Sequence, residues 1–180
     1  MTQTTYPTTT ATTAPAARTA PSGDFRAMMS SFPTGVAVIA AEDLDGTPRG
    51  MTCSSVCSVA LDPPTLLVCL REGSPTLQAV LASGEFTVNL LHEDARDVAE
   101  LFASGDPERF RVTPWDRRPE GAGPHLSRDA HTIADCTVSL TQRVGDHVTV
   151  YGRVRGIRTP SELPPLLYGL RTFAAWPAVT

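Results

Sequence analysis

Short runs of apolar residues, separated by residues that favour turns, recur along the chain from Thr34 onward. The runs GVAVIAAE, TLLVCL and EFTVNLL have the length of buried strands and contain β-branched residues. After the first run, DLDG predicts a turn in which Gly46 takes a positive φ. A further strand is predicted from Arg49 to Ala60, where LDPP ends it. These patterns indicate a sheet of short strands.

The second half of the chain predicts a β-hairpin. In TIADCTVSLTQRV apolar and polar positions alternate, and HVTVYGRVRGI follows after a turn at residues 144–146. The apolar positions expected to lie mostly on one face are Ile133, Ala134, Cys136, Val138 and Leu140. The Pro-, Gly- and Arg-rich stretch 113–129 predicts a long surface loop before the hairpin. The apolar segment PPLLYGLRTFAAW is expected to pack back on the sheet.

Three segments have helical signals. Asp24 is expected to cap a short helix, FRAMMSSF, which ends before Pro33. Ser74 and Pro75 predict the start of a second helix, TLQAVLAS, which Gly84 ends. Residues 94–103 place Val98, Leu101 and Phe102 on one side of a third helix, and GDPERF continues as a turn or short helix.

About six or seven strands with two or three helices predict a mainly β fold with flanking helices, a barrel rather than alternating βαβ units. Residues 1–22 consist largely of Thr, Ala and Pro, and are expected to be a disordered tail because they offer little apolar surface to bury. The folded domain is therefore expected to span residues 23–180.

Composition excludes several classes of function. Hydrophobic residues make up 41% of the chain, and 15 basic against 19 acidic residues leave a net charge of −4. This balance favours neither nucleic acid nor an anionic membrane as partner. No apolar run approaches the roughly 20 residues that cross a bilayer. The four cysteines form no CxxC pair, so we expect no metal site, no disulfide framework and a cytoplasmic location.

Familiar catalytic motifs are missing from the sequence. It has no GxGxxG after a strand, no GxxxxGK[ST] and no GxSxG. An enzyme with this sequence would therefore take its difficult chemistry from a cofactor.

Three short stretches are candidate binding segments, each with an ordinary structural alternative. Residues 52–58 carry four hydroxyl groups, which can hold a phosphate or the polar edge of a ring but are also common at barrel corners. Ser74, with Arg71 and Thr76 nearby, marks either an anion site at a helix start or a plain N-cap. His147 follows a Gly-Asp turn, where it can contact a ligand or simply end the turn.

Taken in order, these pieces resemble the flavin reductase family with the FMN-binding split β-barrel fold, the reductase components of two-component flavin-dependent monooxygenases. The matching segments span residues 24–176 and are FRAMMSSFPTGVAVIAA, RGMTCSSVCSVALDPPTLLVCL, SPTLQAVLASGEFTVNLL, LFASGDPERF, GDHVTVYGRV and PPLLYGLRTF. Two departures stand out. Cys53 replaces the family's frequent alanine, and TFAAWPAVT replaces a commoner basic Gly-x-Tyr ending.

The resemblance implies an NAD(P)H-dependent flavin reductase that passes hydride from NADH or NADPH to FMN or FAD. It implies a homodimer whose reduced flavin diffuses to a partner monooxygenase. His147 is expected near the nicotinamide. The cofactor-binding residues that it implies are Thr34, Val36, Thr52, Cys53, Ser54, Ser55, Ser58, Ser74, Thr76, Arg109 and Tyr168. Two alternatives remain: a split-barrel flavoprotein that serves another oxidation or stores flavin, and a small β-barrel binding module without catalysis.

Overall fold

A computed structural model describes residues 19–177, so residues 1–18 of the predicted tail, and residues 178–180, lie outside the described part. Within it there are four helices: α1 (Ser22–Ser30), α2 (Pro75–Ser83), α3 (Arg96–Ser104) and α4 (Arg109–Val112). The strands are β1 (Thr34–Gly35), β2 (Ala37–Glu42), β3 (Pro48–Cys53), β4 (Val56–Leu61), β5 (Pro64–Arg71), β6 (Glu85–Leu91), β7 (Ala130–Val144), β8 (His147–Arg158), β9 (Leu166–Gly169) and β10 (Thr172–Ala175).

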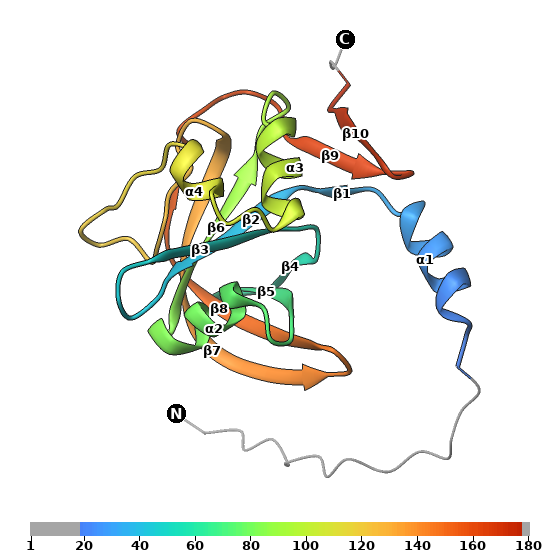
Figure 1. The fold of residues 1–180 in the computed structure, drawn as a ribbon, viewed down its shortest axis with the longest axis horizontal. Helices are drawn as coiled ribbons and strands as arrows, with labels where there is room; N and C mark the ends of the chain where they lie inside the picture. Colours follow the sequence, from blue (N-terminus) through green and yellow to red (C-terminus); the bar gives the residue numbers. More distant parts are fainter. Residues whose placement is uncertain (1–18, 178–180) are drawn as a thin grey trace.

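Seven antiparallel strands form the main sheet, in the order β3-β2-β6-β7-β8-β5-β4. The sheet curls into a barrel, with α2 at one end and α3 and α4 at the other (Figure 1). β1, β9 and β10 form a separate three-stranded sheet from the start and the end of the domain. The predicted mainly β fold with flanking helices is thus confirmed.

β2 is the central strand because both of its faces are buried. Ala37, Ile39 and Ala41 point into the barrel core, where α2 also packs. Val38 and Ala40 belong to a second core on the outer face, which α3 covers. A strand buried on both faces needs a continuous apolar run, and AVIAA supplies one.

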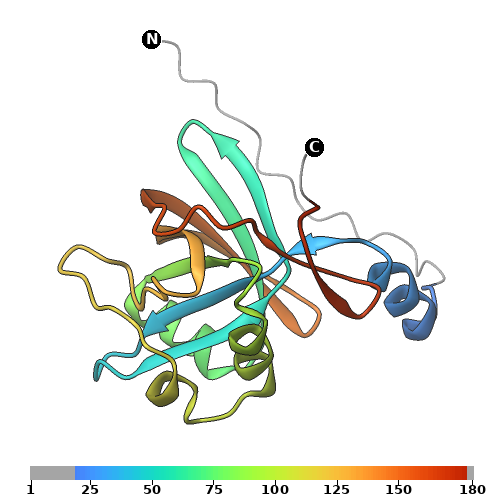
Figure 2. The same ribbon diagram turned by 90° about the horizontal axis from the view of Figure 1, so that it is seen from above.

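The strand predicted from Arg49 to Ala60 is two strands. β3 pairs with β2 and ends at Cys53, whereas β4 begins at Val56 and pairs with β5. The intervening Ser55 hydroxyl donates to the Cys69 carbonyl at 3.1 Å and accepts from the Cys69 N–H at 3.2 Å. The prediction of one strand was wrong because these side-chain bonds replace ladder bonds where the chain changes partner. Figure 2 shows the β4–β5 hairpin projecting from the barrel body.

The predicted boundaries of α2 are confirmed. The Ser74 hydroxyl accepts from the Leu77 N–H at 3.2 Å, and Gly84 ends the helix in the left-handed region at φ 71°. The predicted cap of α1 was wrong: the helix begins at Ser22 after Pro21, and Asp24 lies in its first turn. No residue of α1 is buried, and both views place this helix apart from the barrel (Figures 1 and 2).

The stretch 113–129 is only partly a surface loop. Residues 122–126 are buried because side chains of β6 hold their backbone: Asn89 accepts the Leu126 N–H at 2.8 Å, and Thr87 donates to the Pro124 carbonyl at 2.7 Å. These polar partners compensate for burial of loop backbone, which composition alone does not reveal.

One expected core position, Leu140, is 57% exposed. The pairing of β7 with β8 shifts between Val138 and Leu140, and an irregularity of this kind reverses which face later residues occupy. Gly46 takes its predicted positive φ of 81°. None of the helices in residues 19–177 is long and apolar enough to cross a membrane.

Gly152 of β8 faces the barrel core and leaves no room for a methyl group. A Cβ there would overlap the Phe86 ring, 2.8 Å from its Cε1, and would lie 3.0 Å from the Cys136 Cβ. We expect Gly152→Ala to lower the free energy of unfolding by about 1–3 kcal/mol through overpacking. Urea denaturation measures the loss. Gly156→Ala on the same strand is the matched control, since its Cβ would meet only Asp135 Oδ2 at 3.9 Å. Equal stability of the two variants would contradict the prediction.

Candidate functional site

Four of the residues predicted to bind flavin line one cavity of about 380 Å³: Val36, Thr52, Ser54 and Tyr168. They come from the β1–β2 link, β3, the β3–β4 break and β9, segments that lie far apart in the sequence. The remaining lining residues are Glu100, Ala103, Arg171 and Phe173. The structure therefore brings part of the predicted set together around a real hollow.

The β1–β9 pair builds one wall of this cavity. Thr34 lies opposite Tyr168 in the register, and the Val36 N–H donates to the Leu166 carbonyl at 3.1 Å. The Tyr168 ring packs on Phe173 with centroids 5.1 Å apart. The Thr34 hydroxyl is buried and has no hydrogen-bond partner within the described residues. Such a group beside a cavity is suited to a polar ligand atom, because an unpaired buried hydroxyl is otherwise costly.

The segment from Thr52 to Ser55 forms the floor, and its hydroxyl groups differ in availability. The Thr52 hydroxyl donates to the Ala99 carbonyl of α3 at 2.6 Å, and Ser55 is bonded to Cys69. Ser54 is exposed at the cavity. Ser54 is therefore the hydroxyl in this segment best placed to contact a ligand, while Thr52 and Ser55 hold the backbone in position.

Cys53 is buried within the same segment. Its Sγ lies 3.1 Å from the Ser55 Oγ, and only 7% of the residue is exposed. Burial raises the pKa of the Cys53 thiol above its ordinary value, because the charged thiolate would lose its hydration. Cys53 is thus a neutral packing group near pH 7.

A second group of predicted residues meets where β5 turns into α2 and β7 turns into β8. Arg71 pairs with His147 in the register, and the Glu72 N–H donates to the Asp146 carbonyl at 2.9 Å. His147 Nδ1 lies 2.9 Å from Asp146 Oδ1, and the hydrogen bond lowers the pKa of Asp146. The His147 side chain remains 46% exposed, so its ring is open to a ligand.

Ser74 and Thr76 are close to this corner in sequence, but they differ in burial. Ser74 caps α2 with its hydroxyl, as described, and stays partly exposed. Thr76 is 1% exposed and faces the interior. Ser55 links the corner to the cavity floor, because its partner Cys69 lies on β5 two residues before Arg71.

Two predicted residues lie outside these groups. Ser58 is exposed on β4, within the projecting hairpin. Arg109 lies on α4, where its Nη1 donates to the Asp106 carbonyl at 2.7 Å. Partial burial lowers the pKa of Arg109, and the positive charge of Arg49 lowers it further. Arg109 is therefore grouped with Arg49 near the start of β3, rather than with Ser74 and Thr76.

Sequence reasoning missed the lining residues Glu100, Ala103, Arg171 and Phe173. Glu100 and Ala103 are three apart on α3, so helical spacing could have placed them on one face. Glu100 accepts a hydrogen bond from the Arg96 Nε at 2.8 Å. Arg171 lies in the β9–β10 turn with a φ of 60°, a conformation that the sequence does not signal.

The residues that line the cavity are suited to binding a ligand. The cavity offers apolar and aromatic walls, one exposed hydroxyl, the Glu100 carboxylate and the Arg171 cation. The buried unpaired hydroxyl belongs to Thr34, the residue paired with Tyr168. This mixture suits a flat, partly polar ring system that carries its own chemistry.

Comparison with known proteins identifies the family of this chain. The family model described as a flavin reductase like domain matches residues 29–177. The NADPH flavin reductase of Lentzea aerocolonigenes is 52% identical over 153 residues, which cover 85% of this chain and 89% of the relative. The reductase subunit of a flavin-dependent monooxygenase from Mycobacterium tuberculosis is 36% identical, over 80% of this chain and 76% of its own.

A solved structure has the same architecture. The NADH:FAD oxidoreductase of Streptomyces globisporus C-1027, in complex with NAD and FAD fragments, aligns with a TM-score of 0.80 at 26% identity. The alignment covers 89% of this chain and 98% of that chain. The resemblance found in the sequence is thus confirmed, and the chain belongs to the flavin reductase-like domain family.

Proposed function

We propose that this protein is an NAD(P)H-dependent flavin reductase that reduces FMN or FAD and releases the reduced flavin to a partner flavin-dependent monooxygenase. The single observation that carries the proposal is the cavity in which Val36, Thr52, Ser54 and Tyr168 meet. The relatives named as flavin reductases, and as a reductase subunit of a monooxygenase, support the reaction and the delivery of flavin.

The residues of the cavity fit a flavin. Val36 and Tyr168 offer apolar contact to the faces of a ring, while Ser54 and the unpaired Thr34 hydroxyl offer hydrogen bonds to its polar edge. The Cys53 thiol and the Ser55 hydroxyl both donate to the Cys69 carbonyl, so this segment is already ordered before a ligand arrives. Binding to a site ordered in advance costs less conformational entropy.

The phosphate end has several candidate partners. α2 begins at the Ser74–Pro75 step, where helix N–H groups and the helix dipole favour an anion. We assign Ser74 and Thr76 to this end, Thr76 through its backbone because its side chain is buried. Arg109 is assigned a longer-range charge role, and Ser58 a contact from the β4–β5 hairpin.

When bound, the nicotinamide supplies a hydride and the flavin accepts it. The protein's own part is to hold the two rings face to face and to exclude water between them. We assign His147 to orient the nicotinamide, because its ring is exposed and its Nδ1 pairs with the Asp146 carboxylate. No proton transfer by a side chain is required for this step, which agrees with a site built for positioning.

We also propose a homodimer. Phe25, Met28, Met29 and Phe32 on and after α1 are each at least 43% exposed, a large apolar area for one short helix. The Leu170 N–H donates to the Ser30 carbonyl at 2.5 Å, which ties α1 to the β9–β10 turn that carries Arg171. A second copy covering α1 would therefore stand beside the cavity. We place the reaction in the cytoplasm, where the four free cysteines stay reduced.

The reductase reaction is tested by oxidation of NADH or NADPH, with FMN, FAD or no flavin added. We expect rapid loss of the nicotinamide absorbance only when flavin is supplied, because flavin acts as a substrate. A folded protein that oxidises neither nicotinamide with either flavin would overturn the proposed function. Tight flavin binding without turnover would instead indicate a storage protein.

His147→Ala tests the role of the imidazole. We expect kcat/KM for the nicotinamide to fall about tenfold, equivalent to about 1.4 kcal/mol, with flavin affinity unchanged. His131→Ala is the control, since His131 lies at the opposite end of the β7–β8 hairpin. If the two variants have equal kcat/KM values, the assigned role of His147 is wrong.

The dimer is tested on α1. We expect light scattering after gel filtration to give twice the chain mass of 19.2 kDa, and Met28→Asp with Phe32→Asp to halve that value. The exposed Arg26→Gln on the same helix should leave the mass unchanged. A wild-type mass of one chain would refute the homodimer.

A further inference from the structure

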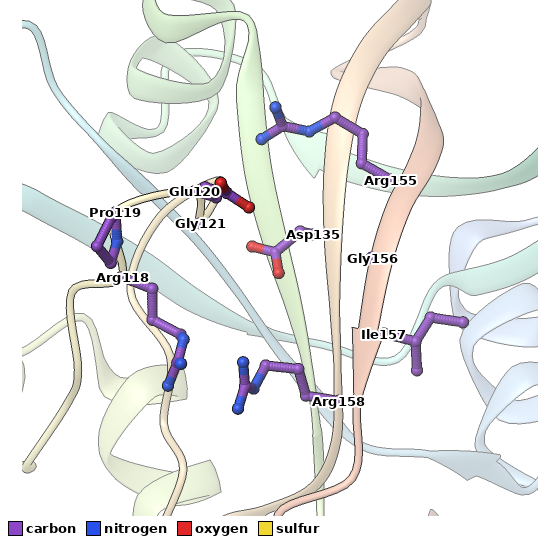
Figure 3. A pocket seen from close by; sticks show the side chains of 9 residues that line it. All are labelled: Arg118, Pro119, Glu120, Gly121, Asp135, Arg155, Gly156, Ile157 and Arg158. Carbon is purple, nitrogen blue, oxygen red and sulfur yellow. The ribbon is translucent and has the colours of Figure 1, made fainter.

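A second and larger cavity, of about 740 Å³, lies between the 118–121 segment and the end of β8. Residues 118–121 form one wall, residues 155–158 form the other, and Asp135 of β7 lies between them (Figure 3). It shares no lining residue with the cavity assigned to flavin. We call it the β8 groove.

The groove is opened by an irregularity in β8. Asp135 pairs with Gly156 but the next residue, Cys136, pairs with Val154, so Arg155 is an extra residue in the strand. A bulge of this kind redirects side chains out of the regular alternation. Gly156 adds to the opening, because a Cβ there would meet only Asp135 Oδ2, at 3.9 Å.

Hydrogen bonds to Asp135 hold the chain next to the wall formed by residues 118–121. Asp135 Oδ1 accepts the Ala122 N–H at 2.7 Å and lies 2.9 Å from Nε2 of the fully buried His125. Gly121 lets the backbone approach the His125 ring closely. A Cβ added at this position would lie 3.2 Å from the Arg118 Cβ and 3.3 Å from His125 Nε2. The groove is therefore a built cavity with a fixed floor rather than a gap beneath a loose loop.

The groove is lined by three arginines and two carboxylates, and the arginines differ in whether they form ion pairs. Arg155 pairs with Glu85 at 3.1 Å, whereas Arg118 and Arg158 make no ion pair within residues 19–177. Figure 3 shows the Asp135 carboxylate with Arg155 on one side and Arg118 and Arg158 on the other. Two unpaired guanidinium groups in a chain of net charge −4 favour an anionic ligand, and guanidinium matches phosphate geometry in particular.

The carboxylates of Asp135 and Glu120 favour a phosphate joined to a sugar over a free phosphate. Asp135 and Glu120 would repel a bare phosphate beside them, but they accept hydrogen bonds from hydroxyl groups, as carboxylates do with ribose in dinucleotide sites. Ile157, 67% exposed on the rim, offers apolar contact to a flat base. The volume lies in the range of small-molecule sites, and such a hollow suits a small ligand better than a protein surface.

We propose that the β8 groove binds a nucleoside diphosphate group, either as a free nucleotide or as half of a dinucleotide, and ADP serves as its probe. Arg118 and Arg158 hold the phosphates, Asp135 and Glu120 accept the ribose hydroxyls, and Ile157 contacts the base. This site lies apart from the proposed flavin cavity, so it adds a second nucleotide position to the protein.

The proposal is tested by calorimetric titration of the full chain with ADP. FMN is present at a saturating concentration, so that the flavin cavity is filled. We expect saturable binding that Arg158→Gln and Arg118→Gln each weaken about tenfold or more, through loss of a charged phosphate contact. Arg153→Gln is the matched control, since Arg153 is exposed on the same strand but does not line the groove. It should bind ADP as the wild type does, and thermal unfolding confirms that each variant is folded.

Two further ligands separate the possible sources and the alternatives. ADP-ribose, whose distal phosphate is blocked as in a dinucleotide, should bind as well as ADP if half of a dinucleotide is the ligand, and more weakly if a free nucleotide is. Inorganic pyrophosphate should bind at least tenfold more weakly than ADP. Any one of four results would overturn the proposal. The first two are the absence of saturable ADP binding and an equal loss of binding in Arg153→Gln. The others are unchanged binding in both groove variants and pyrophosphate binding as tight as that of ADP. These outcomes do not depend on the reductase assay.

Discussion

The rest of the site depends on the hydroxyl group of Ser55, which connects the β3–β4 break to β5. Here the chain leaves its pairing with β2 and starts to pair with β5, and one side chain bonds both backbone groups of Cys69. Each such bond stabilises the fold by about 1 kcal/mol, but its position matters more than its strength. It brings the end of β3 against β5, so the cavity floor and the His147 corner share one support.

From that support, the cavity is assembled from elements that the chain order keeps apart. β1 and β9 bring the two ends of the domain together, and α3 adds Glu100 and Ala103 from the middle. β2 makes this possible because both of its faces are buried: one core fills the barrel and the other seats α3. A cofactor-dependent enzyme needs such a rigid frame, because its contribution is to orient rings that react by their own chemistry.

Cationic side chains are distributed unevenly around this frame. Arg171 lines the cavity proposed for flavin, Arg49 and Arg109 lie within Coulombic reach of each other near the start of β3, and the β8 groove carries three arginines. Carboxylates accompany the arginines in both cavities: Glu100 in the first, and Asp135 and Glu120 in the second. The bulge at Arg155 shows how a local irregularity in a regular ladder contributes to one such place.

The sequence by itself determined the elements whose causes are local. The Ser74–Pro75 start and Gly84 end of α2, the positive φ of Gly46 and the β7–β8 hairpin all follow from side chains acting on their own backbone. Ordered motifs also identified the family. Only the tertiary structure decided the break at Ser55, the exposure of Leu140 and the burial of residues 122–126. Each of these depends on a partner distant in sequence (Cys69, the shifted β8 register and Asn89 respectively), and local pattern carries no information about such partners.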